Sequence, residues 1–212
     1  MKKTISFIAI AACCLLSAIS ADAQIVGSKS SSITTTTVAK NNDYSNYSRL
    51  YLGYTSPKLR YEDESVSGNG VTLGWATGIN LTGYKLPLYL EVGVEADYSN
   101  FKEGKSSIDI VDIDVPINVV YKFTIPSTSI SIAPLAGLNA KVVALANGNG
   151  ENMYSNNDVV KRFMLGYNLG FDVYFSKFSV FYRFQNDFMP FINYDSEKVY
   201  LKKNVIGFSF VF

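Results

Sequence analysis

Apolar and polar residues alternate with a period of two along most of the chain after residue 46. Six runs are clear, and in each of them every second residue is apolar or aromatic. They cover residues 71–81, 88–98, 111–123, 163–175, 178–184 and 206–212. Of the 34 positions on these faces, 33 are apolar or aromatic, and Thr77 is the exception. Alternation with period two is typical of a β-strand that has one apolar face.

Two less regular runs, at about 49–55 and 130–143, bring the number of predicted strands to eight. Short connections at 82–87, 124–129 and 176–177 alternate with longer polar segments at 56–69, 99–107, 145–160 and 187–201. In an antiparallel meander, this places every short turn at one end of the strands and every long loop at the other. The third to sixth strands span 11–14 residues, whereas soluble sheets favour about 5–6 residues and a tilted membrane-spanning strand needs about 9–11.

The second face of these strands is rich in small residues. Eight glycines fall on it: Gly53, Gly74, Gly78, Gly93, Gly137, Gly166, Gly170 and Gly207. Glycine weakens a strand, but the narrow lumen of an eight-stranded barrel needs small side chains to leave room for larger ones. The pattern therefore predicts an all-β fold, a closed antiparallel up-and-down transmembrane barrel of eight strands. Pro116 and Pro134 predict a bulge or a local break, and Leu135 and Phe181 are expected to point inward.

The charged residues of the strands also fall on the glycine-bearing face. Because opposite charges in a confined lumen can pair, we expect a structural charge network inside the barrel. Its predicted members are Arg49, Glu91, Glu95, Asp112, Asp114, Lys122, Lys141, Arg162, Asp172 and Arg183. None of the 34 counted positions on the other face is charged, as expected for a face in lipid, where a basic residue costs about 2–4 kcal/mol at the midplane.

The N-terminus predicts export. Lys2 and Lys3 precede an apolar stretch at 7–16, and Ala21-Asp22-Ala23 is typical of a signal-peptidase site. We expect residues 1–23 to be a signal peptide, residues 24–46 a polar flexible segment, and residues 47–212 the barrel. No run of eighteen apolar residues follows the signal, so the sequence predicts no transmembrane helix.

The composition of the chain excludes several kinds of catalytic and metal site. The chain contains no histidine, which removes Ser-His-Asp catalysis and histidine-dependent zinc sites. Both cysteines lie in the predicted signal peptide, and without that peptide 17 basic residues balance 17 acidic ones. No nucleic-acid partner and no cofactor are expected. Asp112 with Asp114, or Glu91 with Glu95, would suit acid–base work or calcium, but structural salt bridges are the favoured interpretation, so we expect no enzyme.

The C-terminal residues 205–212, Val-Ile-Gly-Phe-Ser-Phe-Val-Phe, carry a resemblance. With the signal peptide and the alternating strands, they make residues 47–212 resemble the small eight-stranded outer-membrane barrels of the porin family. The resemblance implies residence in the outer membrane of a Gram-negative bacterium, in contact with lipid and lipopolysaccharide. It also implies that Phe208, Phe210 and Phe212 are the signal recognised by the barrel-assembly machinery. Members of this family range from envelope stabilisers to adhesins and enzymes, so the role stays open.

Three functions remain as hypotheses. The favoured one is a structural or surface-recognition role through long extracellular loops, with a lumen plugged by polar and charged side chains. In that case an extracellular partner is expected to contact the apolar stretch 188–194, through Phe188, Phe191 and Tyr194. Alternatively, this stretch extends the barrel strands above the membrane or anchors the barrel at the level of lipopolysaccharide. The second hypothesis is a small passive channel, although water-filled porins use about 16–18 strands. The third is a soluble periplasmic or secreted barrel resembling a lipocalin.

Overall fold

The computed structural model describes residues 44–61, 64–154, 160–194 and 197–212, and these residues form an all-β structure. The predicted signal peptide and residues 24–43 lie outside the described residues, as do the side chains of Tyr194 and Glu197. Within the described part of the chain, no helix is long and apolar enough to cross a membrane.

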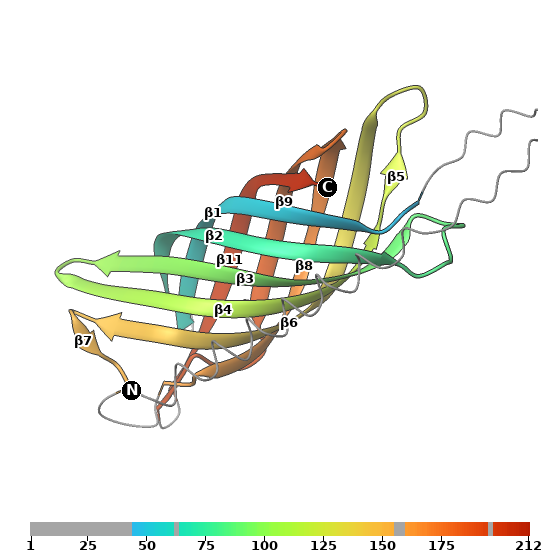
Figure 1. Cartoon of the computed structure of the whole chain (residues 1–212). Helices are drawn as coiled ribbons and strands as arrows, with labels where there is room; N and C mark the ends of the chain where they lie inside the picture. The colour runs from blue at the N-terminus through green and yellow to red at the C-terminus, as the bar shows by residue number, and fades with distance from the viewer. Residues whose placement is uncertain (1–43, 62–63, 155–159, 195–196) are drawn as a thin grey trace, which may run out of the picture. The chain divides into compact units, whose positions relative to one another are not determined.

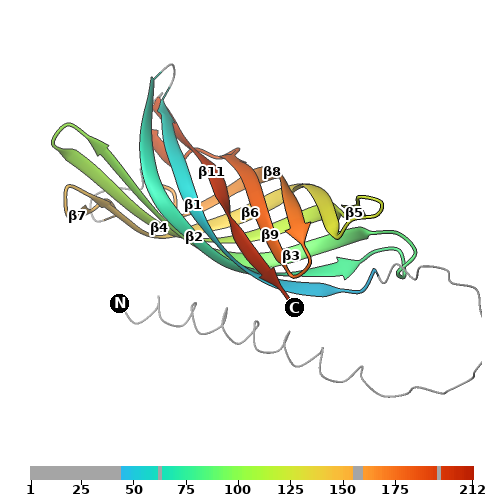
Figure 2. The same ribbon diagram turned by 90° about the horizontal axis from the view of Figure 1, so that it is seen from above.

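Eight long strands build one antiparallel sheet that closes on itself (Figures 1 and 2). They are β1 (Tyr47–Tyr61), β2 (Glu64–Asn80), β3 (Leu88–Glu103), β4 (Ser106–Tyr121), β6 (Ile130–Gly148), β8 (Phe163–Phe175), β9 (Phe178–Asp187) and β11 (Glu197–Val211). Three short strands flank them: β5 (Phe123–Thr124), β7 (Glu151–Asn152) and β10 (Ile192–Tyr194). Each long strand pairs with the next, and β1 pairs with β11 from Arg49↔Val211 to Tyr61↔Val199. The prediction of a closed eight-stranded meander is confirmed.

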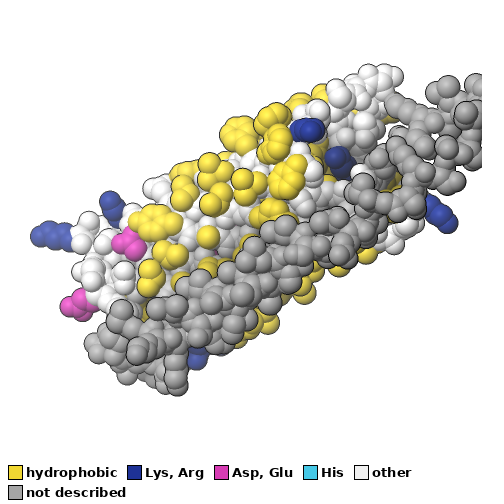
Figure 3. Space-filling view, viewed as in Figure 1, with side chains coloured by type: hydrophobic (Ala, Val, Ile, Leu, Met, Phe, Trp, Pro, Cys, Tyr) yellow, Lys and Arg dark blue, Asp and Glu magenta, His cyan; other side chains and the backbone are white. Residues whose placement is uncertain are grey.

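The outer wall is apolar, and the middle of the interior carries buried charged residues. None of the 34 positions assigned to the lipid face is buried, and Leu52 and Phe208 expose 60% and 71% of their surface. Figure 3 shows a broad apolar surface on the visible wall, with charged groups toward its two ends. Inside, Arg49, Arg183, Lys141 and Lys203 are among the largest fully buried side chains. A soluble barrel with an apolar interior would have the opposite distribution, so the lipocalin-like hypothesis is wrong.

Two of the four predicted long loops, 56–69 and 99–107, are mostly paired strands. β1 continues to Tyr61 and β2 starts at Glu64, so most of the expected loop 56–69 is a hairpin; β3 and β4 likewise fill most of 99–107. In Figure 2 these two hairpins project beyond the rest of the wall. The loop prediction is wrong because the apolar alternation on the outer face stops where lipid ends, while the backbone hydrogen-bond ladder continues.

We call the part of these hairpins and of the adjoining β11 that lies beyond the lipid-facing wall the extension. In the extension the alternation of apolar and polar residues reverses. Lys58 and Arg60 of β1 are exposed, and Leu59 between them is buried. Phe101, Ile110 and Leu201 are likewise buried inside the extension. The outer face is thus apolar in the membrane-spanning part and polar in the extension. The inner face carries the charged residues in the membrane-spanning part and is apolar in the extension.

Both prolines lie at local interruptions of the ladder, as predicted. Pairing of β3 with β4 stops at Val92↔Ile117 and resumes at Glu95↔Asp114 in the same register, leaving out Pro116. Pro134 lies in the gap of β6 between the segments that pair with β4 and β5. On their other sides both prolines stay in register, Pro116 opposite Asn139 and Pro134 opposite Phe171, and the register shift of β4 lies at Val111/Asp112. Leu135 and Phe181 are buried, as expected.

The lipid-facing assignment is tested by replacing Leu73 with arginine. Leu73 lies on β2 between Leu52 and Ala96, so we expect Leu73→Arg to destabilise the barrel by about 2–4 kcal/mol in urea unfolding from lipid bilayers. Ser106→Arg, at an exposed position opposite Glu103 at the tip of the β3–β4 hairpin, is the control and should change stability by less than about 0.5 kcal/mol. Equal effects of the two substitutions would contradict the assignment.

Candidate functional site

The lumen is filled in three layers along the barrel axis. At the short-turn end an apolar cluster contains Tyr89, Val120, Ala133, Leu135 and Tyr174. At the long-hairpin end a larger one contains Leu59, Phe101, Ile110, Val143, Ala146, Met164, Phe191 and Leu201. Charged residues lie between these two clusters along the barrel axis. On β3, for example, the inward residues Glu91, Glu95 and Asp97 separate Tyr89 from Phe101. We call the buried charged residues between the two apolar layers the charged band. A smaller apolar cluster lies beside them and consists of Tyr51, Ala76, Phe181 and Val205.

Arg49 is the centre of the band on the short-turn side. Its guanidinium donates to Glu91 Oε1 at 2.7 Å and to Asp172 Oδ1 at 2.5 Å, which joins β1 to β3 and β8. Tyr47 donates its hydroxyl to the other oxygen of Glu91 at 2.9 Å. Because both guanidinium contacts are charge-assisted, Arg49 holds three strands of the wall together through the lumen.

Arg183 continues this cluster from β9. Its Nη2 lies 3.7 Å from Glu91 Oε1 and its Nη1 lies 3.7 Å from Glu95 Oε2. The guanidinium also lies 4.6 Å from the centroid of the Tyr51 ring, so it stacks as well as pairs.

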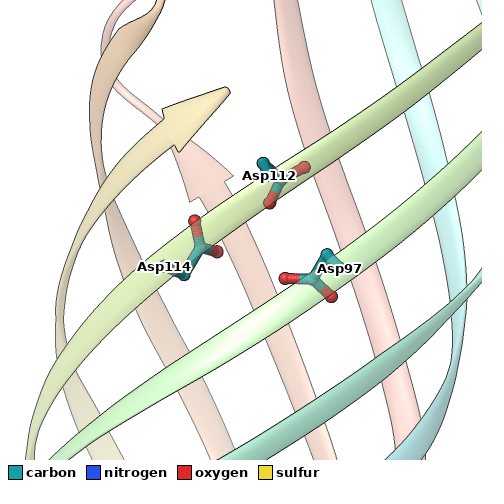
Figure 4. A group of neighbouring side chains, drawn as sticks. All are labelled: Asp97, Asp112 and Asp114. Atoms are coloured by element: carbon teal, nitrogen blue, oxygen red, sulfur yellow. The ribbon is translucent and has the colours of Figure 1, made fainter. Parts of the chain in front are cut away.

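Lys203 and Lys141 serve the long-hairpin side of the band. Figure 4 shows Asp97 on β3 and Asp112 and Asp114 on β4, and their carboxylates lie close enough together to bind a cation. The Lys203 ammonium lies 2.6 Å from Asp112, 3.2 Å from Asp97 and 4.0 Å from Asp114. Lys203 therefore supplies the positive charge that these carboxylates would otherwise take from a metal ion. Lys141 lies 3.1 Å from Asp187 and 3.9 Å from Asp114.

Carboxylates outnumber cations in the band. Among the residues that the structure describes, seven buried carboxylates face four buried cations; the carboxylates are Glu91, Glu95, Asp97, Asp112, Asp114, Asp172 and Asp187. Asp114 is the least well compensated, since neither of its oxygens accepts a hydrogen bond from a protein group. Each cation is therefore shared, and losing one leaves more than one carboxylate without a partner.

The structure brings eight of the ten predicted network residues into the band: Arg49, Glu91, Glu95, Asp112, Asp114, Lys141, Asp172 and Arg183. Lys122 lies at its short-turn edge, half-buried, with its ammonium 4.1 Å from the Tyr174 ring centroid.

Arg162 does not belong to the network, and its assignment is wrong. It precedes β8, is exposed, and stacks 4.0 Å from the ring centroid of Tyr154 near the long-hairpin end. The backbone there has left the strand alternation on which the assignment depended. Burial raises the pKa of Tyr154 to about 12 although the Arg162 charge opposes the shift, so this phenol stays neutral at physiological pH.

Three members of the band were not among the ten predicted network residues: Asp97, Asp187 and Lys203. The alternation had placed Asp97, but not the other two, on the glycine-bearing face. Asp97 shares the inner face with Glu95 and accepts a hydrogen bond from the Thr72 hydroxyl. Extending the alternation of β9 past Phe184, and that of β11 back from Phe208, would have placed Asp187 and Lys203 inside.

The candidate contact segment 188–194 is split between outside and inside. Phe188 is 55% exposed and lies 5.4 Å from the Tyr167 ring. Phe191, however, is fully buried in the apolar layer at the long-hairpin end, so its assignment as a surface contact is wrong. Its backbone N–H donates to the carbonyl of Val199, and this pairing turns the side chain inward. The Tyr194 side chain lies outside the described residues.

Phe208, Phe210 and Phe212 all lie exposed on the outer wall at the closing strand. Phe210 packs against Phe178 and Phe212, with ring centroids 5.2 Å and 6.2 Å apart. The apolar wall, the closed ladder and the charged interior together are those of a membrane-spanning barrel of the outer-membrane type.

Comparisons with solved structures give small barrels. The structure is similar to the attachment invasion locus protein Ail of Yersinia pestis, with a TM-score of 0.49 and 12% identity over 79% of this chain and 99% of that one. It is similar to Neisserial surface protein A, with a TM-score of 0.43 and 12% identity over 78% and 96% of the two chains. It is also similar to the outer membrane enzyme PagL, with a TM-score of 0.47 and 14% identity over 74% of this chain and 98% of that one. A scan against protein-family models gives no match, and a search of curated proteins gives none.

The sharing of Arg49 predicts a large loss of stability when its charge is removed. We expect Arg49→Met to destabilise the barrel by about 3–5 kcal/mol in urea unfolding from bilayers, because Glu91 and Asp172 lose their closest cation. Arg162→Met removes the same charge from an exposed site and should cost much less. Similar losses for the two variants would contradict the pairing.

The excess of carboxylates predicts the opposite behaviour for Asp114. Asp114→Asn keeps the shape of the side chain and removes one surplus negative charge, so the same assay should give unchanged or higher stability. A loss as large as that of Arg49→Met would mean that the band depends on every carboxylate.

Proposed function

We propose that this protein is a sealed outer-membrane barrel whose interior serves stability and whose working surface is the extension formed by its long hairpins. One observation carries the proposal. The apolar layer that closes the lumen at the long-hairpin end is also the core of the extension, since Leu59, Phe101 and Leu201 come from strands that continue beyond the lipid-facing wall. The hairpins thus have a packed core of their own and form a rigid platform.

The filling of the lumen favours a plug over a channel. An ion would have to pass two apolar layers and a band of paired charges, and eight strands leave a lumen that side chains fill. Phe181 and Tyr51 also contact edge to face inside the barrel, with ring centroids 5.7 Å apart.

The same sealing argues against catalysis by the buried carboxylates. Asp112 contacts the Lys203 ammonium, and Glu91 contacts Arg49 and Arg183. Both residues lie between the two apolar layers, where a water-borne substrate would not reach them. Salt bridging is the role that these contacts support.

The topology supports an outward orientation of the hairpins. The first and last long strands meet at the short-turn end, where the backbones of Ser48 and Phe212 exchange two hydrogen bonds. A chain exported from the cytoplasm enters the outer membrane from the periplasm, so this end is periplasmic. The exposed phenylalanines 208, 210 and 212 then lie where the barrel-assembly machinery would meet the closing strand, and the extension faces the cell exterior.

Single-channel recording in a planar bilayer tests the sealed lumen. We expect the purified full-length protein to give no conductance steps above baseline, whereas a 16-stranded porin inserted in the same bilayer gives open-channel steps. Reproducible steps from this protein would overturn the plug and favour the small passive channel.

Amide hydrogen exchange tests the platform in the same preparation. We expect the hairpin amides of Leu59, Phe101 and Ile110 to exchange slowly, because they lie in a ladder over a packed core. The amides of Ser127 and Ser129, in the exposed turn between β5 and β6, are the internal control and should exchange fast. Equally fast exchange in both regions would contradict a rigid extension.

A further inference from the structure

Four basic residues gather on the outer face of the extension where β1 and β11 leave the lipid-facing wall. They are Lys58 and Arg60 on β1 and Lys198 and Lys202 on β11. Below them on the same two strands lie the exposed apolar residues Tyr54 and Ile206. We call these four residues the basic cluster.

The height of the cluster matches the lipid headgroups. Lys58 follows Tyr54 by four residues and Lys202 precedes Ile206 by four. Four residues extend about 13 Å along a strand, and a tilt of about 40° reduces this to about 10 Å of height. The polar zone on each side of the hydrocarbon core is about 5–8 Å thick. The backbone of Lys58 and Lys202 thus lies just beyond it, and their long side chains can reach back into its outer part.

The register places like charges face to face. Lys58 and Lys202 are direct partners across the closing pair of strands. Like charges directly opposite on neighbouring strands destabilise a sheet. Within the described residues, neither these two lysines nor Lys198 forms a salt bridge. A negatively charged ligand between Lys58 and Lys202 would relieve the repulsion.

A groove of about 560 Å³ lies beside Lys202, which lines it, whereas Lys58 faces Lys202 from the neighbouring strand. Arg60, Lys198 and Lys202 line it together with Tyr167, Asn186 and Tyr200. Asp187 also borders it, but its carboxylate faces Lys141 inside the lumen at 3.1 Å. The groove thus combines three cations with two phenols and an amide, all of which can donate hydrogen bonds to an oxyanion.

We propose that the basic cluster is a binding site for the phosphate groups of lipopolysaccharide. A guanidinium and ammonium groups are the side chains that bind phosphate best, and the apolar wall directly below accommodates the acyl chains of the same lipid. The site rests on the outward orientation proposed above, because lipopolysaccharide occupies the outer leaflet. It adds a defined lipid subsite on one side of the barrel, at the strands that close it.

The test is a titration of the full-length protein in detergent with diphosphorylated lipid A, followed by native mass spectrometry and thermal melting. We expect saturable binding and a higher melting temperature. Lys58→Gln with Lys202→Gln should weaken binding by about 10- to 100-fold, since two charge-assisted contacts are lost. Lys102→Gln with Lys105→Gln removes the same charge from the β3–β4 hairpin, away from the groove, and should bind as the parent protein does.

Each result decides the proposal. Equal binding of dephosphorylated lipid A, or unchanged affinity in the Lys58/Lys202 variant, would overturn it. Binding of inorganic phosphate or dextran sulfate to the cluster without competition by lipid A would overturn it in favour of a soluble anion. Without ligand, the Lys58/Lys202 variant should melt at or above the parent temperature because the repulsion is gone, which separates lost binding from misfolding. None of these readouts depends on conductance or orientation, so the site can fail while the sealed barrel stands.

Discussion

The closing pair of strands, β1 with β11, is the interaction on which the rest of the structure depends. A sheet in lipid has no water to satisfy its edges, so every backbone group must find a partner within the wall. Closing the ring after eight strands fixes a narrow lumen. At the closure Gly53 faces Gly207, and a Cβ on Gly207 would lie 2.6 Å from Gly53 Cα and 2.8 Å from the Phe181 ring. These two glycines let the strands meet beneath an inward phenylalanine.

The narrow lumen dictates the charged band. Polar side chains there cannot reach bulk water, so they must satisfy one another. Arg49 does this by joining Glu91 and Asp172, and Lys203 does it by contacting three aspartates. Removing a cation from such a sealed layer is costly because the carboxylates cannot take up water instead. The apolar layers on both sides complete the seal, and the one at the long-hairpin end supports the extension.

The sequence predicted the lipid-facing part of the strands better than the hairpins that extend beyond it. Alternation over residues such as 163–175 and 206–212 located the strands and the inward charges, because lipid selects apolar residues at every outward position. The same signal failed at Lys58–Leu59–Arg60, where the outward face becomes polar and the inward face apolar. A reversed alternation indicates a strand as well, and reading it would have extended β1 and β11 and placed Leu59 and Leu201 in a core. The cross-barrel partners of Arg49 depend on the order and stagger of all eight strands, which pairwise spacing along the chain does not supply.

The distribution of apolar residues outside and charges inside is tested most directly by gel migration of the membrane fraction in SDS, with and without boiling. A closed barrel whose ladder has no free edge resists SDS at room temperature. The protein should therefore sediment with the outer membrane and migrate faster before boiling than after it. A soluble protein that migrates identically under both conditions would contradict the membrane-spanning barrel and would require the apolar faces to point inward.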